Sequence, residues 1–159
     1  MKSTMPPALE AIASELGNAD RQERIEILID FAKSLPPLPE KLAEFKDTAH
    51  RVEECQSPIY LFVEVTPDQT VEFHADAPIE APTVRGFVAI LVEGLAGATA
   101  QQVLALQDDL IERMGLPEIL GMLRVRGLHG VLRRIKTEVA RGLIANELSS
   151  PTANTTRIS

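Results

Sequence analysis

At 159 residues the chain has the length of one domain and is long enough to bury a substantial core. Its 45% hydrophobic and 25% charged residues are typical of a globular protein, and no apolar run approaches the ~20 residues of a membrane-spanning helix. The net charge of −7 argues against nucleic acid as a partner, because phosphate contacts need clustered Lys and Arg. Since residues 1–17 also lack the apolar stretch of a signal peptide, we expect a soluble cytoplasmic protein without membrane contact.

Two amphipathic helices are predicted in the first third of the chain. The first covers about residues 8–17, where apolar side chains recur at helical spacing. The second begins at Asp20, a good N-cap residue with Glu23 at the capping-box position, and the Pro-rich segment 35–39 ends it. A short helical turn is expected at 41–46. The residues expected to face the core are Leu9, Ile12, Ala13 and Leu16 in the first helix and Ile25, Leu28, Ile29 and Ala32 in the second.

The middle of the chain changes from helical spacing to the alternation of β-strands. Residues 59–65 are rich in β-forming side chains, and residues 71–75 alternate apolar and polar side chains. The segment 66–69 between them has the composition of a turn. We therefore predict a β-hairpin, with residues 50–53 as a short additional strand beside it.

The second half of the chain is predicted to be helical. A helix is expected from Pro82 to Leu95, followed by two short helices that are separated near residues 107–108. A last long helix is expected from about Leu128 to Ile144, with a disordered tail over 148–159 after a single domain over 1–147. These elements predict an α+β fold, a small antiparallel β-sheet with helices packed on one side.

Basic residues gather late in this otherwise acidic chain. They are Arg124, Arg126, Arg133, Arg134, Lys136 and Arg141. One interpretation is that they complement the dipole of the last helix and keep its outer face in solvent. The other is that they form a docking surface for an acidic partner.

The single cysteine, Cys55, is the residue whose role the sequence leaves most open. A lone cysteine excludes an internal disulfide, a Cys-x-x-Cys redox pair and a cysteine-rich metal site. Glu53 and Glu54 precede it and disfavour the thiolate, and the Ser-Pro pair at 57–58 places it on a loop ahead of the first strand. A buried structural cysteine is one interpretation.

Independent thiol catalysis would need a histidine base close to the sulfur. The three histidines are His50, His74 and His129, and none stands at a spacing from Cys55 that is typical of a catalytic pair. A thiol that only receives and passes on a group needs no base of its own, because a partner protein can supply the activation. This remains an alternative to a structural role.

Three segments resemble the motifs of the SufE family, the sulfur acceptors of cysteine desulfurases. ECQSPIYL at 54–61 resembles the active-site segment, in which a cysteine followed by Gln-Ser precedes an apolar strand. EAPTVRGFVAIL at 80–91 and LQDDLIERMGLPEILGMLRVRGLHGVLRRIK at 106–136 resemble two further motifs in the order that the family shows. The resemblance covers about residues 8–143, although Glu54 stands where many relatives have Gly and Ile119 where a histidine is common.

The resemblance implies a function as well as an α+β fold similar to iron–sulfur scaffold proteins. It implies that Cys55 takes sulfur as a persulfide from a SufS-like, PLP-dependent cysteine desulfurase, stimulates that enzyme and passes the sulfur to a SufBCD-like scaffold complex. The protein would then be an accessory sulfurtransferase, with PLP on the partner and no cofactor of its own, as a monomer or weak homodimer. Burial of the thiol in an apolar pocket, relieved when the desulfurase binds, would keep Cys55 unreactive.

Further site residues follow from the same motifs. The candidates for contacts with the cysteine loop or with the partner are Glu54, Gln56, Ser57, Glu80, Arg85, Arg124 and Arg126. Gly86 and Gly127 also match family positions. Two alternatives stay open: Glu80 as a capping or first-turn acid of the helix that follows, and the arginines at 124 and 126 as a solvated helix end.

Two other functions compete with sulfur transfer. A stand-alone thiol enzyme, such as a one-cysteine peroxidase or an acyl-transfer enzyme, lacks a spaced Cys/His pair. An iron–sulfur scaffold holds its cluster with several thiolates, and this chain offers one.

Overall fold

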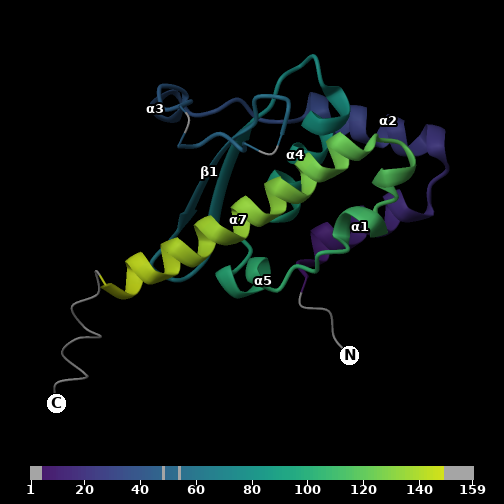
Figure 1. The fold of residues 1–159 in the computed structure, drawn as a ribbon. Coiled ribbons are helices and arrows are strands. Elements are labelled where there is room, and N and C mark those ends of the chain that lie inside the picture. Colours follow the sequence, from purple (N-terminus) through teal and green to yellow (C-terminus); the bar gives the residue numbers. More distant parts are fainter. Residues whose placement is uncertain (1–4, 48, 54, 149–159) are drawn as a thin grey trace.

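The computed structural model describes residues 5–47, 49–53 and 55–148. Figure 1 shows a long helix lying along a two-stranded sheet, with the remaining long helices grouped on the other side of the molecule from the sheet's turn. The elements are α1 (Pro7–Asn18), α2 (Arg21–Lys33), α3 (Glu40–Ala43), β1 (Tyr60–Val65), β2 (Val71–Asp76), α4 (Pro82–Gly94), α5 (Ala100–Leu104), α6 (Leu110–Arg113), η1 (Leu116–Glu118) and α7 (Met122–Leu148). This order confirms the predicted α+β fold.

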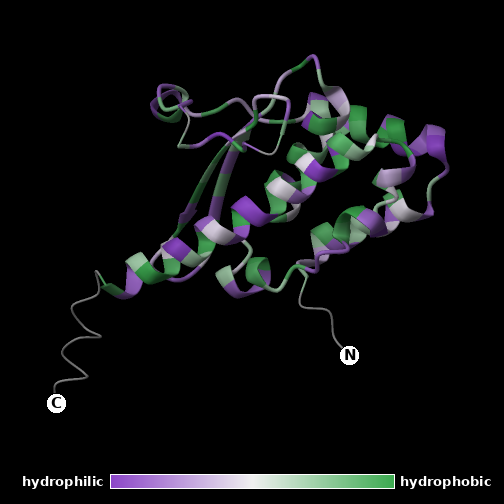
Figure 2. Ribbon diagram, viewed as in Figure 1, coloured by the Kyte–Doolittle hydropathy of each residue, from purple (hydrophilic) through white to green (hydrophobic). Residues whose placement is uncertain are grey.

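Helix α4 lies at the centre of the hydrophobic core, and most of its apolar side chains are buried. It contacts α1, α2, β2 and α7, and Phe87 and Ile90 are completely buried. Figure 2 shows hydrophobic residues over most of α4. Helices α2 and α4 cross at Gly86, where a Cβ atom would lie 2.1 Å from the carbonyl oxygen of Leu28. Only glycine permits this approach without a shift of one helix.

The first two helices begin and end as their local sequence predicts. The Asp20 carboxylate accepts a hydrogen bond from the backbone N–H of Glu23, and the backbone N–H of Asp20 donates to the Glu23 carboxylate, which completes the predicted capping box of α2. Helix α1 ends at Asn18, one residue beyond the predicted stop. The predicted buried face of α2 is wrong in part, because Ile25 and Ile29 are only half-buried.

Arg24 of α2 is buried in the core of the protein, which the apolar pattern of the helix does not predict. Its side chain is 8% exposed, and its guanidinium donates to the carbonyl oxygens of Leu16 at 2.9 Å and Ala19 at 2.7 Å. It also donates to the carbonyl oxygen of Gly115 at 3.2 Å and pairs with Glu118 at 3.0 Å. The carbonyls at the end of α1 lack helical partners, so Arg24 caps that helix and fastens it to the segment before α7.

Strands β1 and β2 form the predicted antiparallel hairpin. Phe62 lies opposite His74, and the turn contains Gln69 with a left-handed φ of 67°. Hydrogen bonds from Thr66 and then Thr70 lower the pKa of the turn residue Asp68. The short strand predicted at 50–53 is reduced to a single bridge between Arg51 and Tyr60.

Helix α7 is longer than predicted at both ends. It begins at Met122, where Gly121 accepts the hydrogen bond from the backbone of Val125 at 3.0 Å, and it reaches Leu148. Near its end Asn146 donates to the carbonyl oxygens of Val65 at 3.3 Å and Thr66 at 2.8 Å. These contacts with the sheet stabilise helical turns whose apolar spacing is weak.

The rest of the predicted helical organisation holds. Thr99 and Gln102 form the predicted capping box of α5, and α6 follows after a break at residues 107–108. No helix in the described part of the chain is both long and apolar enough to cross a membrane. Of the predicted tail over 148–159, Leu148 is the last residue of α7, and residues 149–159 lie outside the described residues, so the division into domain and tail stays a prediction.

Candidate functional site

Cys55 lies on a loop that a pair of buried residues closes at its base. Val52 donates its backbone N–H to the carbonyl oxygen of Ile59 at 2.9 Å, and both residues are completely buried. The backbone N–H of Cys55 bonds to the carbonyl oxygen of Val52 at 3.3 Å. The anchored base therefore directs the loop toward α7.

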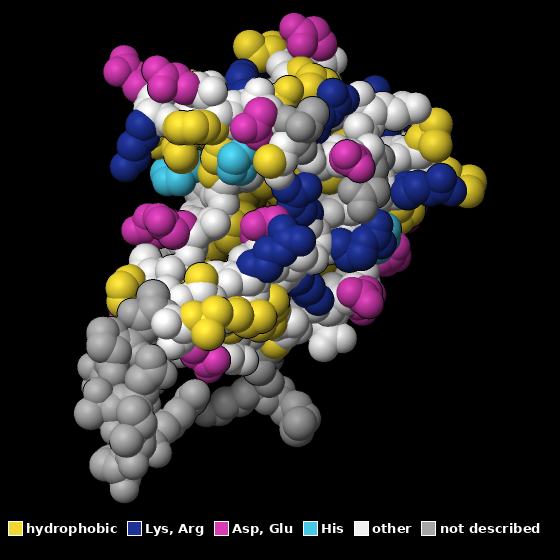
Figure 3. Space-filling view, turned by 60° about the vertical axis from the view of Figure 1, so that its left-hand side comes forward, with side chains coloured by type: hydrophobic (Ala, Val, Ile, Leu, Met, Phe, Trp, Pro, Cys, Tyr) yellow, Lys and Arg dark blue, Asp and Glu magenta, His cyan; other side chains and the backbone are white. Residues whose placement is uncertain are grey.

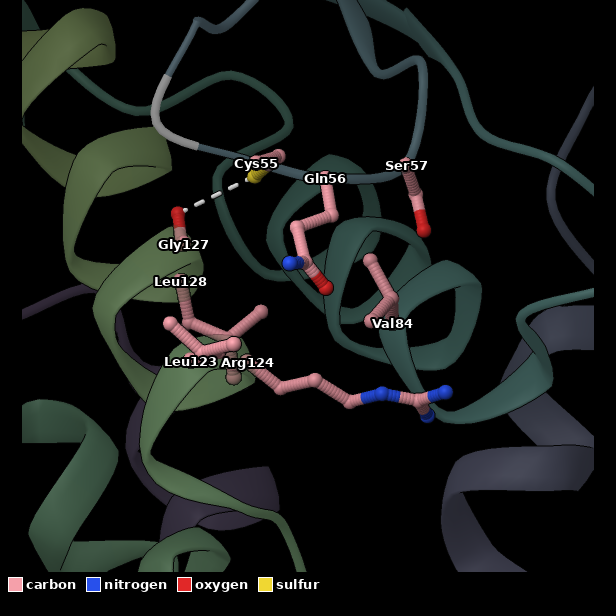
Figure 4. Close-up of a pocket in the computed structure, with 8 residues that line it drawn as sticks. All are labelled: Cys55, Gln56, Ser57, Val84, Leu123, Arg124, Gly127 and Leu128. Carbon is pink, nitrogen blue, oxygen red and sulfur yellow. Dashed lines mark hydrogen bonds between the residues drawn. The ribbon is translucent and has the colours of Figure 1, made fainter.

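The thiol of Cys55 rests against the backbone of α7. The residue is 7% exposed, and its Sγ donates a hydrogen bond to the carbonyl oxygen of Gly127 at 3.2 Å (Figure 4). A Cβ atom on Gly127 would lie 3.1 Å from Sγ and 3.3 Å from the Cα of Cys55. The glycine thus provides the space in which the thiol lies.

A small cavity adjoins the sulfur. Its volume is about 60 Å³, which exceeds the ~10–15 Å³ that one water-sized atom requires on this measure. Figure 4 shows the cysteine loop on one side, α4 behind it and the first turns of α7 on the other side. The lining residues are Cys55, Gln56, Ser57, Val84, Leu123, Arg124, Gly127 and Leu128.

These surroundings favour the neutral thiol. A thiol that donates to a carbonyl oxygen is held in its protonated form, because a thiolate has no proton to give and would face the oxygen's partial negative charge. Burial of the sulfur acts in the same direction, although the cavity beside it is lined by the polar side chains of Gln56, Ser57 and Arg124 as well as by apolar ones. Cys55 is therefore quiet while its loop stays in place.

The described residues offer no general base to this thiol. His129 pairs with Glu112 at 3.1 Å, and His50 bonds to Asp47 at 2.8 Å and stacks on Phe62, while none of the histidines is among the residues that line the cavity. The described residues also contain no group of three or more His, Cys, Asp or Glu that could hold a metal ion. Among the residues that the structure describes, no histidine lies where it could take the proton of this thiol.

The structure brings three of the predicted contact residues to the cavity. Gln56 and Ser57 line it from the loop, and Arg124 lines it from α7. Arg124 is exposed and donates from its guanidinium to the hydroxyl of Thr83 at 3.2 Å, which links the first turns of α7 and α4. Among the described residues, Arg124 therefore bonds to Thr83 and not to Glu53, one of the two glutamates that precede Cys55.

The other predicted contact residues lie elsewhere. Arg85 donates to the carbonyl oxygens of Ala32 at 3.0 Å and of Ala77, so it joins the end of α2 to the segment after β2. Arg126 is exposed on α7 away from the cavity lining. Glu54 lies outside the described residues.

Glu80 does not have the capping role that its position predicts. It is exposed in the turn before α4, whose N-cap is Ala81 and whose first turn carries no acidic residue. The expectation of a capping or first-turn acid is therefore wrong, because the helix begins one residue later than that role requires. A contact with a partner stays a prediction for this side chain.

Sequence reasoning missed an apolar rim around the cavity. Met122 is 85% exposed and Leu123 is 55% exposed in the first turn of α7, and Leu123 also lines the cavity. No signal in the sequence marked them as exposed, because adjacent apolar residues at a helix start can both be buried, as Leu110 and Ile111 are in α6. We define Met122 and Leu123 as the apolar rim.

Among the described contacts, three of the six late basic residues bond to segments outside α7. Arg124 donates to Thr83, Arg134 to backbone carbonyls of the segment before Cys55, and Lys136 to that of Leu106, whereas Arg141 pairs with Glu138 at 3.1 Å within α7. Figure 3 shows Lys and Arg side chains grouped in the middle of one face of the molecule. The expected complement to the helix dipole is wrong, because the last turn of α7 contains no basic residue.

Comparisons with known proteins agree with these features. The model of the SufE family, an Fe-S metabolism associated domain, matches residues 10–139. The chain is 38% identical over 134 residues to an uncharacterized SufE-like protein of Mycobacterium tuberculosis, covering 84% of this chain and 92% of the relative. It is 31% identical over 137 residues to an uncharacterized SufE-like protein of Synechocystis, covering 86% and 82%.

A solved structure extends the comparison to the fold. The solution structure of a hypothetical protein from Thermus thermophilus matches with a TM-score of 0.75 at 31% identity, covering 88% of this chain and 98% of that one. Fold and site together define a small α+β protein that buries one quiet thiol beside a helix. The chain belongs to the SufE family, whose domain is associated with Fe–S metabolism.

Proposed function

We propose that the protein is a sulfur acceptor in iron–sulfur cluster assembly and that Cys55 carries the sulfur. The observation that supports this most is a single thiol buried beside a cavity whose described lining offers no base, on a loop whose sequence resembles the active-site segment of the family. Such a thiol suits a protein whose activation comes from a partner. The partner would be a PLP-dependent cysteine desulfurase that holds a persulfide on its own cysteine.

The transfer resembles thiol–disulfide exchange. The thiolate of Cys55 attacks the outer sulfur of the desulfurase persulfide, and the desulfurase cysteine leaves as a thiolate. One sulfur–sulfur bond forms and one breaks, so the step needs no oxidant or reductant. The proton that Cys55 loses is returned to the leaving thiolate, and Cys55 then carries the persulfide.

The resting geometry requires the loop to move before the transfer. Sγ is buried and bonded to Gly127, so a partner cysteine reaches it only after Cys55 leaves α7. After the loop returns, the cavity of about 60 Å³ has space for one added sulfur and would shield it from solvent thiols. The protein would stimulate the desulfurase by removing its persulfide, and a scaffold complex would receive the sulfur.

The alternative of a stand-alone thiol enzyme is not favoured, because no observation supplies the base that it needs. We place the carrier in the cytoplasm, as a monomer or weak homodimer, with PLP on the desulfurase and no cofactor on this chain.

Intact mass measurement tests the proposal directly. After incubation with a PLP-loaded cysteine desulfurase and free cysteine, we expect the protein to gain one sulfur atom that a reductant removes. Cys55→Ser should gain none, because the chain has no other thiol. The proposal fails if the native protein stays unmodified while the desulfurase turns over, or if Cys55→Ser takes up sulfur equally well.

The apolar rim supplies a second test through docking. We expect Leu123→Glu to raise the desulfurase concentration needed for half-maximal sulfur uptake by about tenfold or more, with little change in the maximal rate, because it weakens docking and not chemistry. Ile144→Glu is the matched control, since Ile144 is 57% exposed on the same helix and Leu123 is 55% exposed. Equal effects of the two substitutions would show that the rim has no special part in docking.

A further inference from the structure

Arg134 of α7 bonds to the segment before the cysteine loop. Arg134 donates from its guanidinium to the carbonyl oxygen of Arg51 at 3.0 Å and to that of Ala49. Its Nε donates to Glu138 at 3.0 Å one helical turn further on, and its side chain is 24% exposed. The guanidinium is therefore oriented by a carboxylate and bound to two carbonyls at the same time.

The pairing of this segment with β1 explains why these two carbonyls are available. The carbonyl oxygen of His50 accepts from Leu61 at 2.9 Å, and the N–H of Val52 donates to Ile59 at 2.9 Å. In an antiparallel pair the groups of alternate residues point to opposite edges, so the carbonyl of Arg51 faces away from β1. Arg134 supplies the donor that the sheet does not.

We propose that Arg134 is a positioning residue that fixes the stem of the cysteine loop to α7 while the tip carrying Cys55 moves. This inference rests on the proposed function as a sulfur acceptor. Residues 49–51 form the stem. Both the stem and the resting thiol then contact the same helix, at Arg134 and at Gly127.

The two contacts differ in strength, which gives them different parts in the movement. A thiol is a weak hydrogen-bond donor, so the bond from Cys55 to Gly127 is readily broken. Bonds from a charged guanidinium are roughly twice as strong as neutral ones, and the planar fork of arginine holds two acceptors at once. The tip is therefore released while the stem stays, and the thiol returns to the same place after each transfer.

Alkylation of the free protein tests this role without any partner. Because Cys55 is the only cysteine, a neutral maleimide reports its exposure alone. We expect Arg134→Gln to raise the labelling rate about tenfold, the factor equivalent to one lost hydrogen bond of ~1.4 kcal/mol. Arg134→Lys should fall between the native protein and Arg134→Gln, because a single ammonium keeps the charge but not the fork.

Lys136→Gln is the matched control. Lys136 lies on the same helix at 26% side-chain exposure and also donates to a backbone carbonyl, that of Leu106, but it does not touch the stem. We expect Lys136→Gln to label within about twofold of the native rate, which separates positioning from general loosening of α7. Labelling of Arg134→Gln at the native rate, or at the rate of Lys136→Gln, would overturn the inference.

Sulfur uptake from the desulfurase separates this inference from the proposed function. With a stem that is no longer fixed, Arg134→Gln should take up sulfur with a lower maximal rate, while the desulfurase concentration for half-maximal uptake stays within about twofold. Failure of the native protein to accept sulfur would refute the proposed function, and the labelling comparison would still decide whether Arg134 holds the stem.

Discussion

Gly127→Ala is expected to leave the protein folded and to increase the alkylation rate of Cys55 about tenfold. The new Cβ would lie 3.1 Å from Sγ and 3.3 Å from the Cα of Cys55, and both distances are shorter than an ordinary van der Waals contact. Gln56, the residue after Cys55 on the loop, is exposed. The cysteine loop can therefore move toward solvent more easily than α7 can move into the core. The thiol then loses its bond to the carbonyl and meets solvent.

Stability should change little in this variant, which makes the labelling result informative. Alanine is favoured over glycine inside a helix by about 1 kcal/mol, and this gain offsets the lost packing of the loop. Urea unfolding and maleimide labelling of the same sample measure the two effects separately.

Gly121→Ala is the control for this experiment, because a Cβ at Gly121 would meet no atom within 4 Å. We expect it to label at the native rate. If Gly127→Ala labels no faster than Gly121→Ala, the close contact with α7 does not restrain the thiol.

Arg24→Met is expected to lower the free energy of unfolding by about 1.5–3 kcal/mol, the range for losing hydrogen bonds of a charged group, because the partner carboxylate of Glu118 is 66% exposed and stays solvated. Methionine preserves length and apolar volume but donates no hydrogen bond. The carbonyl oxygen of Ala19 would lose its guanidinium donor, and those of Leu16 and Gly115 would keep only their backbone donors, the N–H groups of Ala19 and Glu118. Since small domains are stable by only about 5–15 kcal/mol, urea denaturation should detect this loss easily.

Arg21→Met is the matched substitution on the same helix. Arg21 is exposed and makes one hydrogen bond, to the carbonyl oxygen of Glu118 at 2.5 Å, so we expect a loss below about 1 kcal/mol. A loss below about 1 kcal/mol for Arg24→Met as well would mean that water replaces the guanidinium and that the buried network is not a major source of stability.

The local elements were predictable because their signals lie within a few residues of each other. Asp20 and Glu23 cap α2 across three positions, and Thr99 and Gln102 do the same for α5. The limits of α7 were missed because glycines and arginines weaken its local pattern, while contacts such as that of Asn146 with the sheet stabilise its last turns.

The candidate site was predictable at its centre and not around it. Cys55 was assignable because it is the single thiol and stands in a family motif, which needs no knowledge of its surroundings. Arg85 illustrates the limit, since it matches a motif position and yet serves the contact between α2 and β2. A motif identifies which residues recur but not what their side chains touch.

By itself the sequence determined the helices with capping signals, the hairpin and the single thiol to which the proposed function assigns the sulfur. Only the tertiary structure decided that Cys55 rests on Gly127, 72 positions away, and that Arg134 holds the stem from 83 positions away. The physical reason is that helix and strand formation depends on neighbouring residues, whereas a hydrogen bond between distant segments depends on how the whole core packs. An arginine on a helix has the same local propensity whether it meets solvent or a buried carbonyl.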